Sequence, residues 1–221
     1  MEHTELFETL RQYGVIPVIA IESPESALPL ADALIAGGLP VAEITFRTAA
    51  AGEVIATLKK ERPELILGAG TILTLENLRL AHEYGAQFGV APGLNPAIVA
   101  EANRLNMPFI PGVLTPSEIE HAMGLGAKVL KFFPAEESGG VAMLKALAAP
   151  YRHTGVKFVP TGGVTAANLE SYLAQDVVLV VGGTWVAKKE VIAAQDWDTI
   201  RANCRQIREI VARVRGEKQV A

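Results

Sequence analysis

Short apolar runs alternate with longer stretches of mixed polarity along most of the chain. The apolar runs are rich in β-branched residues, which predicts buried strands. Eight strands are expected in this way, at residues 15–21, 41–46, 65–69, 87–91, 109–113, 129–133, 156–159 and 177–181.

The stretches between these runs carry apolar residues at helical spacing and are bounded by capping residues, glycines and prolines. One clear helix start is Thr115, with Pro116 at the first helical position and Glu118 where a capping box requires it. Helices are expected at residues 4–13, 23–36, 49–62, 74–84, 96–105, from 115 onward, and at 141–148, 166–173 and 197–214.

Alternation of this kind is typical of parallel strands joined by helical crossovers. Eight units within 221 residues predict an α/β fold, a (β/α)8 TIM barrel with an additional N-terminal helix and C-terminal helix. No low-complexity linker divides the sequence, so one domain is expected over residues 1–221. A doubly wound open sheet is the alternative that the pattern leaves open.

The composition narrows the class of protein. Half of the residues are apolar and 20% are charged, which is normal for a globular protein, and the net charge of −4 offers no basic surface for nucleic acid. No run of about 18 apolar residues is present, so no membrane span is expected. The acidic N-terminus lacks the features of a secretory signal, and a cytoplasmic protein is expected.

The sequence gives little support for a metal site. The single cysteine, Cys204, excludes an internal disulfide and a cysteine-built metal site. The four histidines, His3, His82, His121 and His153, lie in predicted helices, in loops or at the N-terminus, and none lies at a strand end. We therefore expect no metal ion.

Several polar side chains cluster at the predicted strand ends, where barrels of this type place their active sites. Because side chains alternate along a strand, Glu43, Thr45 and Arg47 share one face, and Lys131 and Phe133 share another. If both faces point inward, a carboxylate, a guanidinium and an amine enter one pocket.

Lys131 lies within an apolar run, where an ammonium group is costly to bury. At an unperturbed pKa of about 10.4, only about one lysine in a thousand is neutral near pH 7.4. Apolar neighbours and Arg47 would favour the neutral, nucleophilic amine, whereas Glu43 would oppose this while ionised and is better suited to carry a proton. The alternatives are a Lys131 side chain that reaches solvent, and a structural ionic cluster with no catalytic use.

Glycine pairs follow the last two predicted strands, at Gly162–Gly163 and Gly182–Gly183, and Thr184 comes directly after the second pair. In such barrels these loops often bind a phosphate group through backbone amides. Glycines also end strands for steric reasons, so neither pair is specific by itself. Together with a buried amine and a carboxylate, the pairs indicate a phosphorylated carbonyl substrate.

The strand-end segments carry specific motifs in a fixed order along the chain: EITFRT at residues 43–48, GAGT at 68–71, APGL at 91–94, KFFPAE at 131–136 and PTGG at 160–163. This set resembles the bacterial 2-keto-3-deoxy-6-phosphogluconate (KDPG) aldolases, which often also act as 4-hydroxy-2-oxoglutarate (KHG) aldolases. The resemblance covers nearly the whole chain, and the KFFPAE segment is its most specific part.

The resemblance implies a class I, metal-independent aldolase without a cofactor, on a (β/α)8 barrel and usually assembled as a homotrimer. It implies that Lys131 forms the Schiff base with the substrate ketone and that Glu43 is the general acid and base. Arg47 and Thr71 match residues that bind the pyruvate-derived carboxylate.

Other positions match the family's substrate pocket. Pro92 and Phe133 match lining residues, and Thr161 matches a residue that contacts substrate and is linked to stereochemical preference. The phosphate would be held by residues at the two glycine pairs, namely Gly162, Gly163, Gly182, Gly183 and Thr184. Many members carry serine where this chain has Thr184, so the extra methyl group would alter the fit of the phosphate.

Three other functions remain open on the sequence. The first is an aldolase of the same chemistry for the 6-phosphogalactonate epimer or for unphosphorylated KHG. The second is a phosphate-sugar isomerase or epimerase, in which Lys131 would act only through its charge and borohydride would trap no adduct. The third is a non-catalytic binder of sugar-acid phosphates, which would bind tightly without turnover.

Overall fold

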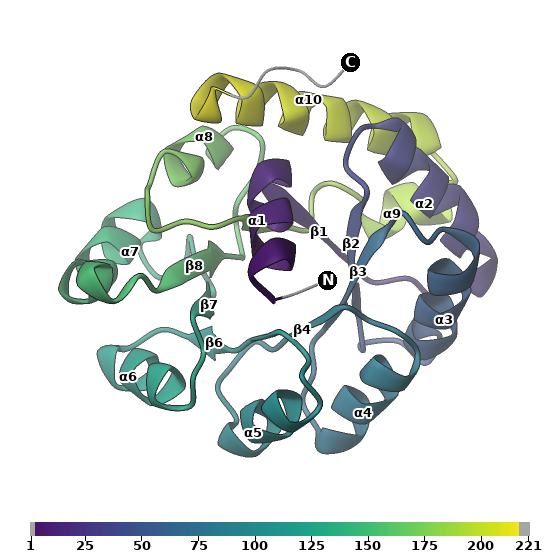
Figure 1. Ribbon diagram of the computed structural model, residues 1–221. Coiled ribbons are helices and arrows are strands. Elements are labelled where there is room, and N and C mark those ends of the chain that lie inside the picture. The colour runs from purple at the N-terminus through teal and green to yellow at the C-terminus, as the bar shows by residue number, and fades with distance from the viewer. Residues whose placement is uncertain (1–2, 217–221) are drawn as a thin grey trace.

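The computed structural model describes residues 3–216 of the 221-residue chain. Most helices lie around the outside, the strands run through the middle, and the N-terminal helix crosses in front of them (Figure 1). The strands are β1 Val15–Ile19, β2 Val41–Thr45, β3 Ile66–Gly70, β4 Phe88–Val90, β5 Phe109–Ile110, β6 Gly112–Val113, β7 Val129–Phe132, β8 Lys157–Pro160 and β9 Val181–Gly183. The α-helices are α1 His3–Tyr13, α2 Ala27–Ala36, α3 Ala51–Glu61, α4 Leu75–Glu83, α5 Pro96–Arg104, α6 Pro116–Gly124, α7 Gly140–Ala148, α8 Leu169–Leu173, α9 Lys189–Ala193 and α10 Trp197–Arg215.

The strands form two parallel sheets that curl around a common centre. One has the order β5-β4-β3-β2-β1-β9 and the other the order β6-β7-β8. The two sheets come near each other at both ends: Lys131 N donates to Pro111 O at 2.8 Å, and isolated bridges join Phe158 to Val178 and Thr161 to Gly182. The architecture is an α/β fold with a curled parallel sheet.

The predicted strand at residues 109–113 is divided by Pro111 into β5 and β6. Proline has no amide hydrogen to donate to a neighbouring strand, so regular pairing is interrupted there. The two halves have different neighbours, because β5 pairs with β4 whereas β6 pairs with β7. A single continuous strand at this position was therefore a wrong expectation.

Alternate residues of the strands pack into two separate apolar clusters. Val41 and Val129 belong to an inner cluster enclosed by the sheets, whereas Ile44 and Leu130 belong to the larger cluster between the sheets and the helices. Because Val41 and Glu43 are two residues apart, as are Val129 and Lys131, Glu43 and Lys131 lie on the inner face. The inward orientation predicted for both strands is confirmed.

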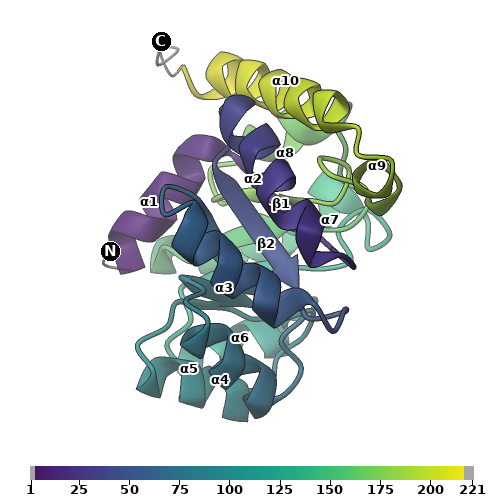
Figure 2. The ribbon, with the colours of Figure 1, turned by 90° about the vertical axis from the view of Figure 1, so that its right-hand side faces the viewer.

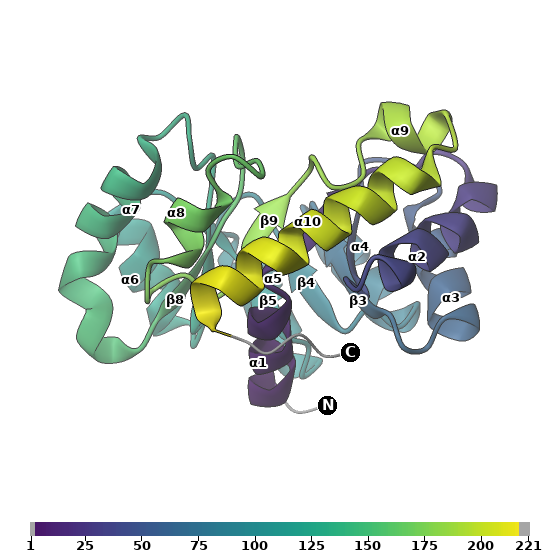
Figure 3. The same ribbon diagram turned by 90° about the horizontal axis from the view of Figure 1, so that it is seen from above.

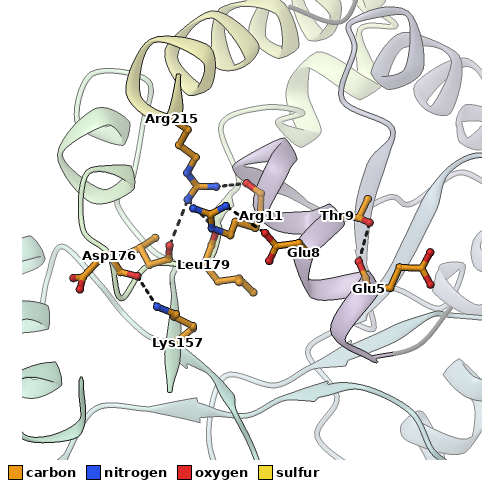
Figure 4. A network of polar contacts seen from close by, with 9 residues as sticks. Glu5, Glu8, Thr9, Arg11, Lys157, Asp176, Leu179 and Arg215 are labelled. Atoms are coloured by element: carbon orange, nitrogen blue, oxygen red, sulfur yellow. Dashed lines mark hydrogen bonds and ion pairs between the residues drawn. The ribbon is translucent and has the colours of Figure 1, made fainter. Parts of the chain in front are cut away.

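Helix α1 lies across the ends at which the strands begin (Figures 1 to 3). Leu6 and Leu10 are buried in the inner cluster, so the helix covers that cluster from below. The side chain of Arg215, the last residue of α10, donates to Arg11 O and, at 2.9 Å, to Leu179 O (Figure 4). These bonds join α10 to α1 and to the segment that leads into β9.

The last predicted strand, at residues 177–181, is shifted in the structure, where the paired strand is Val181–Gly183. Val177 to Val180 are buried, but of these only Val178 makes a strand-type bridge, to Phe158. The first turn of the helix predicted at residues 23–36 is a 3-10 helix, Pro24–Ser26, and α8 begins at Leu169 instead of residue 166.

Two short elements were not predicted, the helix α9 and a 3-10 helix at Ala149–Thr154. The predicted N-terminal and C-terminal helices are present as α1 and α10. The capping box at Thr115 and Glu118 is also confirmed. Within residues 3–216, no helix is long and apolar enough to cross a membrane.

Candidate active site

Lys131 lies near the end of β7 with its side chain enclosed, at 6% exposure. Its Nζ atom lies 5.1 Å from the centroid of the Phe133 ring. In the neighbouring strand the residue in register with Lys131 is Gly112, where an added Cβ would lie 2.1 Å from Pro92 O. Glycine at 112 therefore allows the backbone of Pro92 to approach the strand next to Lys131.

Glu43, on β2, is the second buried ionisable group, at 3% exposure. Its Oε1 atom is fully enclosed and accepts no hydrogen bond from the described residues. Burial raises the pKa of the Glu43 carboxyl, and the charges of Lys131 and Arg47 oppose this rise without cancelling it. A carboxyl with a raised pKa and an unoccupied oxygen is suited to exchanging a proton with a substrate.

Gly70, the last residue of β3, makes room for this carboxyl group. An added Cβ at Gly70 would lie 2.0 Å from Glu43 Oε1, a distance at which atoms overlap. The adjacent residue, Thr71, has a φ of 57°, in the left-handed region that threonine rarely adopts. Such backbone strain often occurs at functional sites, and here it falls at a residue that was expected, from the family resemblance alone, to bind a carboxylate.

Arg47 follows β2 and is held by a short chain of hydrogen bonds. Its Nε atom donates to Thr45 Oγ1 at 3.1 Å, and Thr45 Oγ1 donates to Ile19 O at 2.9 Å. Thr45 is buried, at 1% exposure, whereas Arg47 is exposed. The buried threonine thus fixes the direction of an arginine that remains accessible to a ligand.

The two glycine pairs come together at the ends of β8 and β9, because a bridge joins Thr161 to Gly182. An added Cβ at Gly182 would lie 2.2 Å from Thr161 Oγ1. Gly162 and Gly163 have φ values of 101° and 72°, a conformation that glycine adopts without strain. The structure therefore places the two glycine-rich loops next to each other, with Thr184 exposed beside them.

The buried polar and charged residues of the described part of the chain are Glu43, Thr45, Lys131 and Thr161. All four lie at or near the carboxyl ends of the inner strands, where the sequence predicted the site. No direct hydrogen bond joins Glu43 to Lys131 among the described contacts. The two groups interact through the electrostatic attraction of their charges. Within residues 3–216, no group of three or more histidine, cysteine, aspartate or glutamate residues is arranged to hold a metal ion.

The sequence assigned no role to three residues beside the glycine loops. The Tyr172 hydroxyl donates to Glu136 Oε1, and Glu136 packs against Gly163. The Trp185 ring packs against Gly183, with its Nε1 atom buried and without a described partner. Glu136 belongs to the KFFPAE segment and Trp185 follows Thr184, so their positions in sequence were the available signals.

Comparison with known proteins connects this geometry to a family. The family model for KDPG and KHG aldolase matches residues 6–203. A 2-dehydro-3-deoxy-phosphogluconate aldolase from Treponema pallidum is 48% identical over 206 residues, covering 93% of this chain and 97% of the relative. A KHG/KDPG aldolase from Escherichia coli is 44% identical over 192 residues, covering 87% and 89%.

Solved structures agree with the sequence comparison. A KDPG aldolase from Legionella pneumophila, with pyruvate captured as a covalent carbinolamine intermediate, aligns with a TM-score of 0.88 and 37% identity, covering 94% of this chain and 98% of that one. A KDPG aldolase from Zymomonas mobilis aligns with a TM-score of 0.87 and 36% identity, covering 95% and 98%.

With an enclosed lysine on such a fold, the protein is an aldolase, a carbon–carbon lyase that works through a Schiff base. The chain belongs to the KDPG and KHG aldolase family.

Proposed function

We propose that the enzyme cleaves KDPG to pyruvate and glyceraldehyde 3-phosphate, with Lys131 as the Schiff-base lysine and Glu43 as the acid and base. The observation that carries these roles is the burial of both side chains on the inner face, with one Glu43 oxygen unoccupied. A structural ion pair would be expected to join the two groups by a direct contact, and the described contacts include none between them.

The steps follow from these assignments. The Lys131 amine attacks the C2 ketone, and loss of water gives a protonated imine that accepts electrons. Glu43, directly or through a water molecule, takes the proton from the C4 hydroxyl, the C3–C4 bond breaks, and the aldehyde leaves. The remaining enamine is protonated at C3, and hydrolysis of the imine releases pyruvate and restores the Lys131 amine.

Binding is assigned to the residues around this pair. Arg47 and Thr71 bind the carboxylate of the pyruvate half, because a guanidinium held by Thr45 offers a directed pair of donors. Pro92, Phe133 and Thr161 line the pocket. The phosphate lies at the two glycine pairs, Gly162, Gly163, Gly182 and Gly183, with Thr184 as an added hydroxyl donor.

A second activity, cleavage of KHG to pyruvate and glyoxylate, is also proposed. It uses the same lysine and does not need the phosphate loops. The name of the E. coli relative, a KHG/KDPG aldolase, supports this proposal. Cleavage rates of the purified enzyme on both substrates would test it, and a rate on KHG no higher than that of a Lys131 variant would contradict it.

We further propose that the curled sheets close into one eight-stranded barrel, with β5 and β6 together occupying one strand position between β4 and β7. The Lys131–Pro111 hydrogen bond and the bridges between β8 and the β9 region support this closure. A single domain over residues 1–221, a homotrimer and a cytoplasmic location remain predictions. Light scattering would test the trimer, which requires three times the chain mass of 23.5 kDa.

Borohydride reduction in the presence of pyruvate tests the central assignment. The reduced imine should add a pyruvate-derived mass to the peptide that contains Lys131. Lys131→Arg, which keeps the positive charge, should abolish the adduct, and Lys145→Ala, at an exposed lysine, should not change it. An adduct on another lysine would refute the role of Lys131, and the isomerase alternative predicts no adduct at all.

A further inference from the structure

Two loops beside the site, at residues 134–139 after β7 and at 161–164 after β8, are joined through their backbones. Ala135 N donates to Thr161 O at 2.8 Å, and Glu136 N donates to Gly162 O at 3.1 Å. The first loop carries no residue assigned to the substrate phosphate, whereas the second carries Gly162 and Gly163. The position of the second loop therefore depends on the first.

The Glu136 side chain packs directly on the second loop. An added Cβ at Gly163 would lie 2.5 Å from Glu136 Cβ, so the two residues fit only because one is a glycine. Gly163 also has a φ of 72°, which favours glycine. The carboxylate itself lies on the other side, toward the start of α7, where an added Cβ at Gly140 would be 3.0 Å from Glu136 Oε1.

Tyr172 of α8 binds this carboxylate on the side away from Gly163. The tyrosine is fully buried in the cluster between the sheets and the helices, and its hydroxyl donates to Glu136 Oε1. Burial, followed by the nearby Glu136 carboxylate, raises the pKa of the Tyr172 hydroxyl, so the hydroxyl keeps its proton at neutral pH. A rigid ring thus fixes one end of an otherwise exposed glutamate.

We propose that Tyr172 and Glu136 are positioning residues for the substrate phosphate, acting through Gly162 and Gly163. The hydrogen bond fixes the first loop, and the first loop fixes the backbone of the second. It also draws the negative charge of Glu136 toward α7 and α8, away from a bound phosphate dianion. This inference rests on the proposed function, which places the phosphate at these glycines.

The test is the KM for the phosphorylated aldehyde, measured in the condensation of pyruvate with glyceraldehyde 3-phosphate. Tyr172→Phe keeps the ring and removes only the hydroxyl. We expect the KM to rise about tenfold, as the loss of a hydrogen bond to a charged group predicts. Half-saturation by pyruvate in borohydride trapping should stay within about twofold of wild type, because pyruvate lacks the phosphate.

A second pair of variants keeps the test decisive if Tyr172→Phe does not fold. Glu136 is exposed, so Glu136→Ala leaves the core intact and should raise the same KM, whereas Glu136→Gln keeps an acceptor and should restore most of the affinity. The matched control is another tyrosine–glutamate pair, in which Tyr151 donates to Glu120 at 3.1 Å. Tyr151→Phe and Glu120→Ala should leave the KM unchanged.

The outcomes separate this proposal from the one on which it rests. If the wild-type enzyme forms no pyruvate adduct at Lys131, the proposed function fails and this inference falls with it. If the adduct forms normally but Tyr172→Phe and Glu136→Ala leave the KM for glyceraldehyde 3-phosphate unchanged, only the positioning role is overturned. An equal loss of pyruvate trapping would also overturn it, since that would show general damage to the site.

Discussion

Glu43 illustrates how a residue with a proposed catalytic role can reduce the stability of the folded protein. Its carboxyl is buried, one oxygen has no described partner, and Gly70 leaves the space that the carboxyl occupies. Such a group costs free energy when it ionises in the folded protein. We infer that the site retains it because a proton carrier needs an oxygen that is not already hydrogen-bonded within the protein.

The pH dependence of stability follows from the direction of the Glu43 pKa. The folded-state pKa lies above the unfolded value of about 4.3, so the folded state binds more protons between the two and loses stability as pH rises through this window. Glu43→Gln removes this loss. In urea unfolding, the free energy of unfolding of Glu43→Gln minus that of wild type should therefore be larger at pH 8 than at pH 4. A difference that does not change with pH would contradict the raised pKa.

Thr45 permits a second test at the scale of one residue. Thr45→Val keeps the shape but removes the oxygen to which Arg47 donates, whereas Thr45→Ser keeps that oxygen. We expect half-saturation by pyruvate in borohydride trapping to rise about five- to tenfold for the valine variant and to stay near wild type for the serine variant. Thr48→Val is the control, since Thr48 donates to Ile21 O and has no described bond to Arg47. Equal effects of Thr45→Val and Thr48→Val would contradict the role of Thr45 in orienting Arg47.

At the scale of the elements, most strands could be predicted because they are short continuous apolar runs, and most helices because their apolar residues recur at a period of 3.6. The last strand could not, because an apolar run resembles a strand more than Val181-Gly182-Gly183 does. Close packing explains those glycines: a Cβ at Gly182 would meet Thr161, and one at Gly183 would meet Trp185 at 2.4 Å. Tertiary packing of this kind leaves no local pattern.

The candidate site, too, has a part that could be predicted from the sequence and a part that could not. The inner-face positions of Lys131 and Glu43 could be predicted because a charge in an apolar run is conspicuous in sequence, and alternation gives their shared direction. The bond from Tyr172 to Glu136 could not be found, because it joins a helix to a distant loop and neither residue is unusual where it occurs. Helix α9 was missed because its five residues are too few to establish a helical period.

The contact between β8 and β9 gives a prediction for these elements. In Gly182→Ala the new methyl group would overlap Thr161, and we expect a loss of about 1–3 kcal/mol in the free energy of unfolding. Adding Thr161→Ala should recover part of this loss in urea unfolding. Gly124→Ala is the control, because Gly124 lies at the end of α6 with nothing within 4 Å of an added Cβ. Additive losses in the double variant would contradict a direct clash.

At the scale of the whole molecule, the two apolar clusters have different roles. The larger cluster packs the helices against the sheets, whereas the inner cluster fills the space below the site and is covered by α1. The side chains on the inner face change along the strands, from apolar near α1 to polar at the carboxyl ends. This gradient allows one fold to hold both a core and a reactive pocket.

A substitution at Leu10 tests how much the inner cluster contributes to stability. Its side chain is fully buried under the strands, so Leu10→Ala should lower the free energy of unfolding by about 2–5 kcal/mol. Because α1 lies at the opposite ends of the strands, the KM of the folded enzyme should not change. Leu73→Ala is the matched control: Leu73 is 56% exposed, and its removal should change stability by no more than about 0.5 kcal/mol. A similar stability loss for both leucines would argue against this role of α1.

The position of α1 also determines how molecules enter and leave. Because Leu6 and Leu10 pack into the inner cluster where the strands begin, we expect reactants to enter and leave at the carboxyl ends of the strands. If Lys131 is the Schiff-base lysine, as proposed, the fragment bonded to it leaves after the aldehyde, because the imine must first be hydrolysed. Under the same assignment, abundant pyruvate would keep the enzyme loaded as the imine between turnovers, ready to condense with an aldehyde.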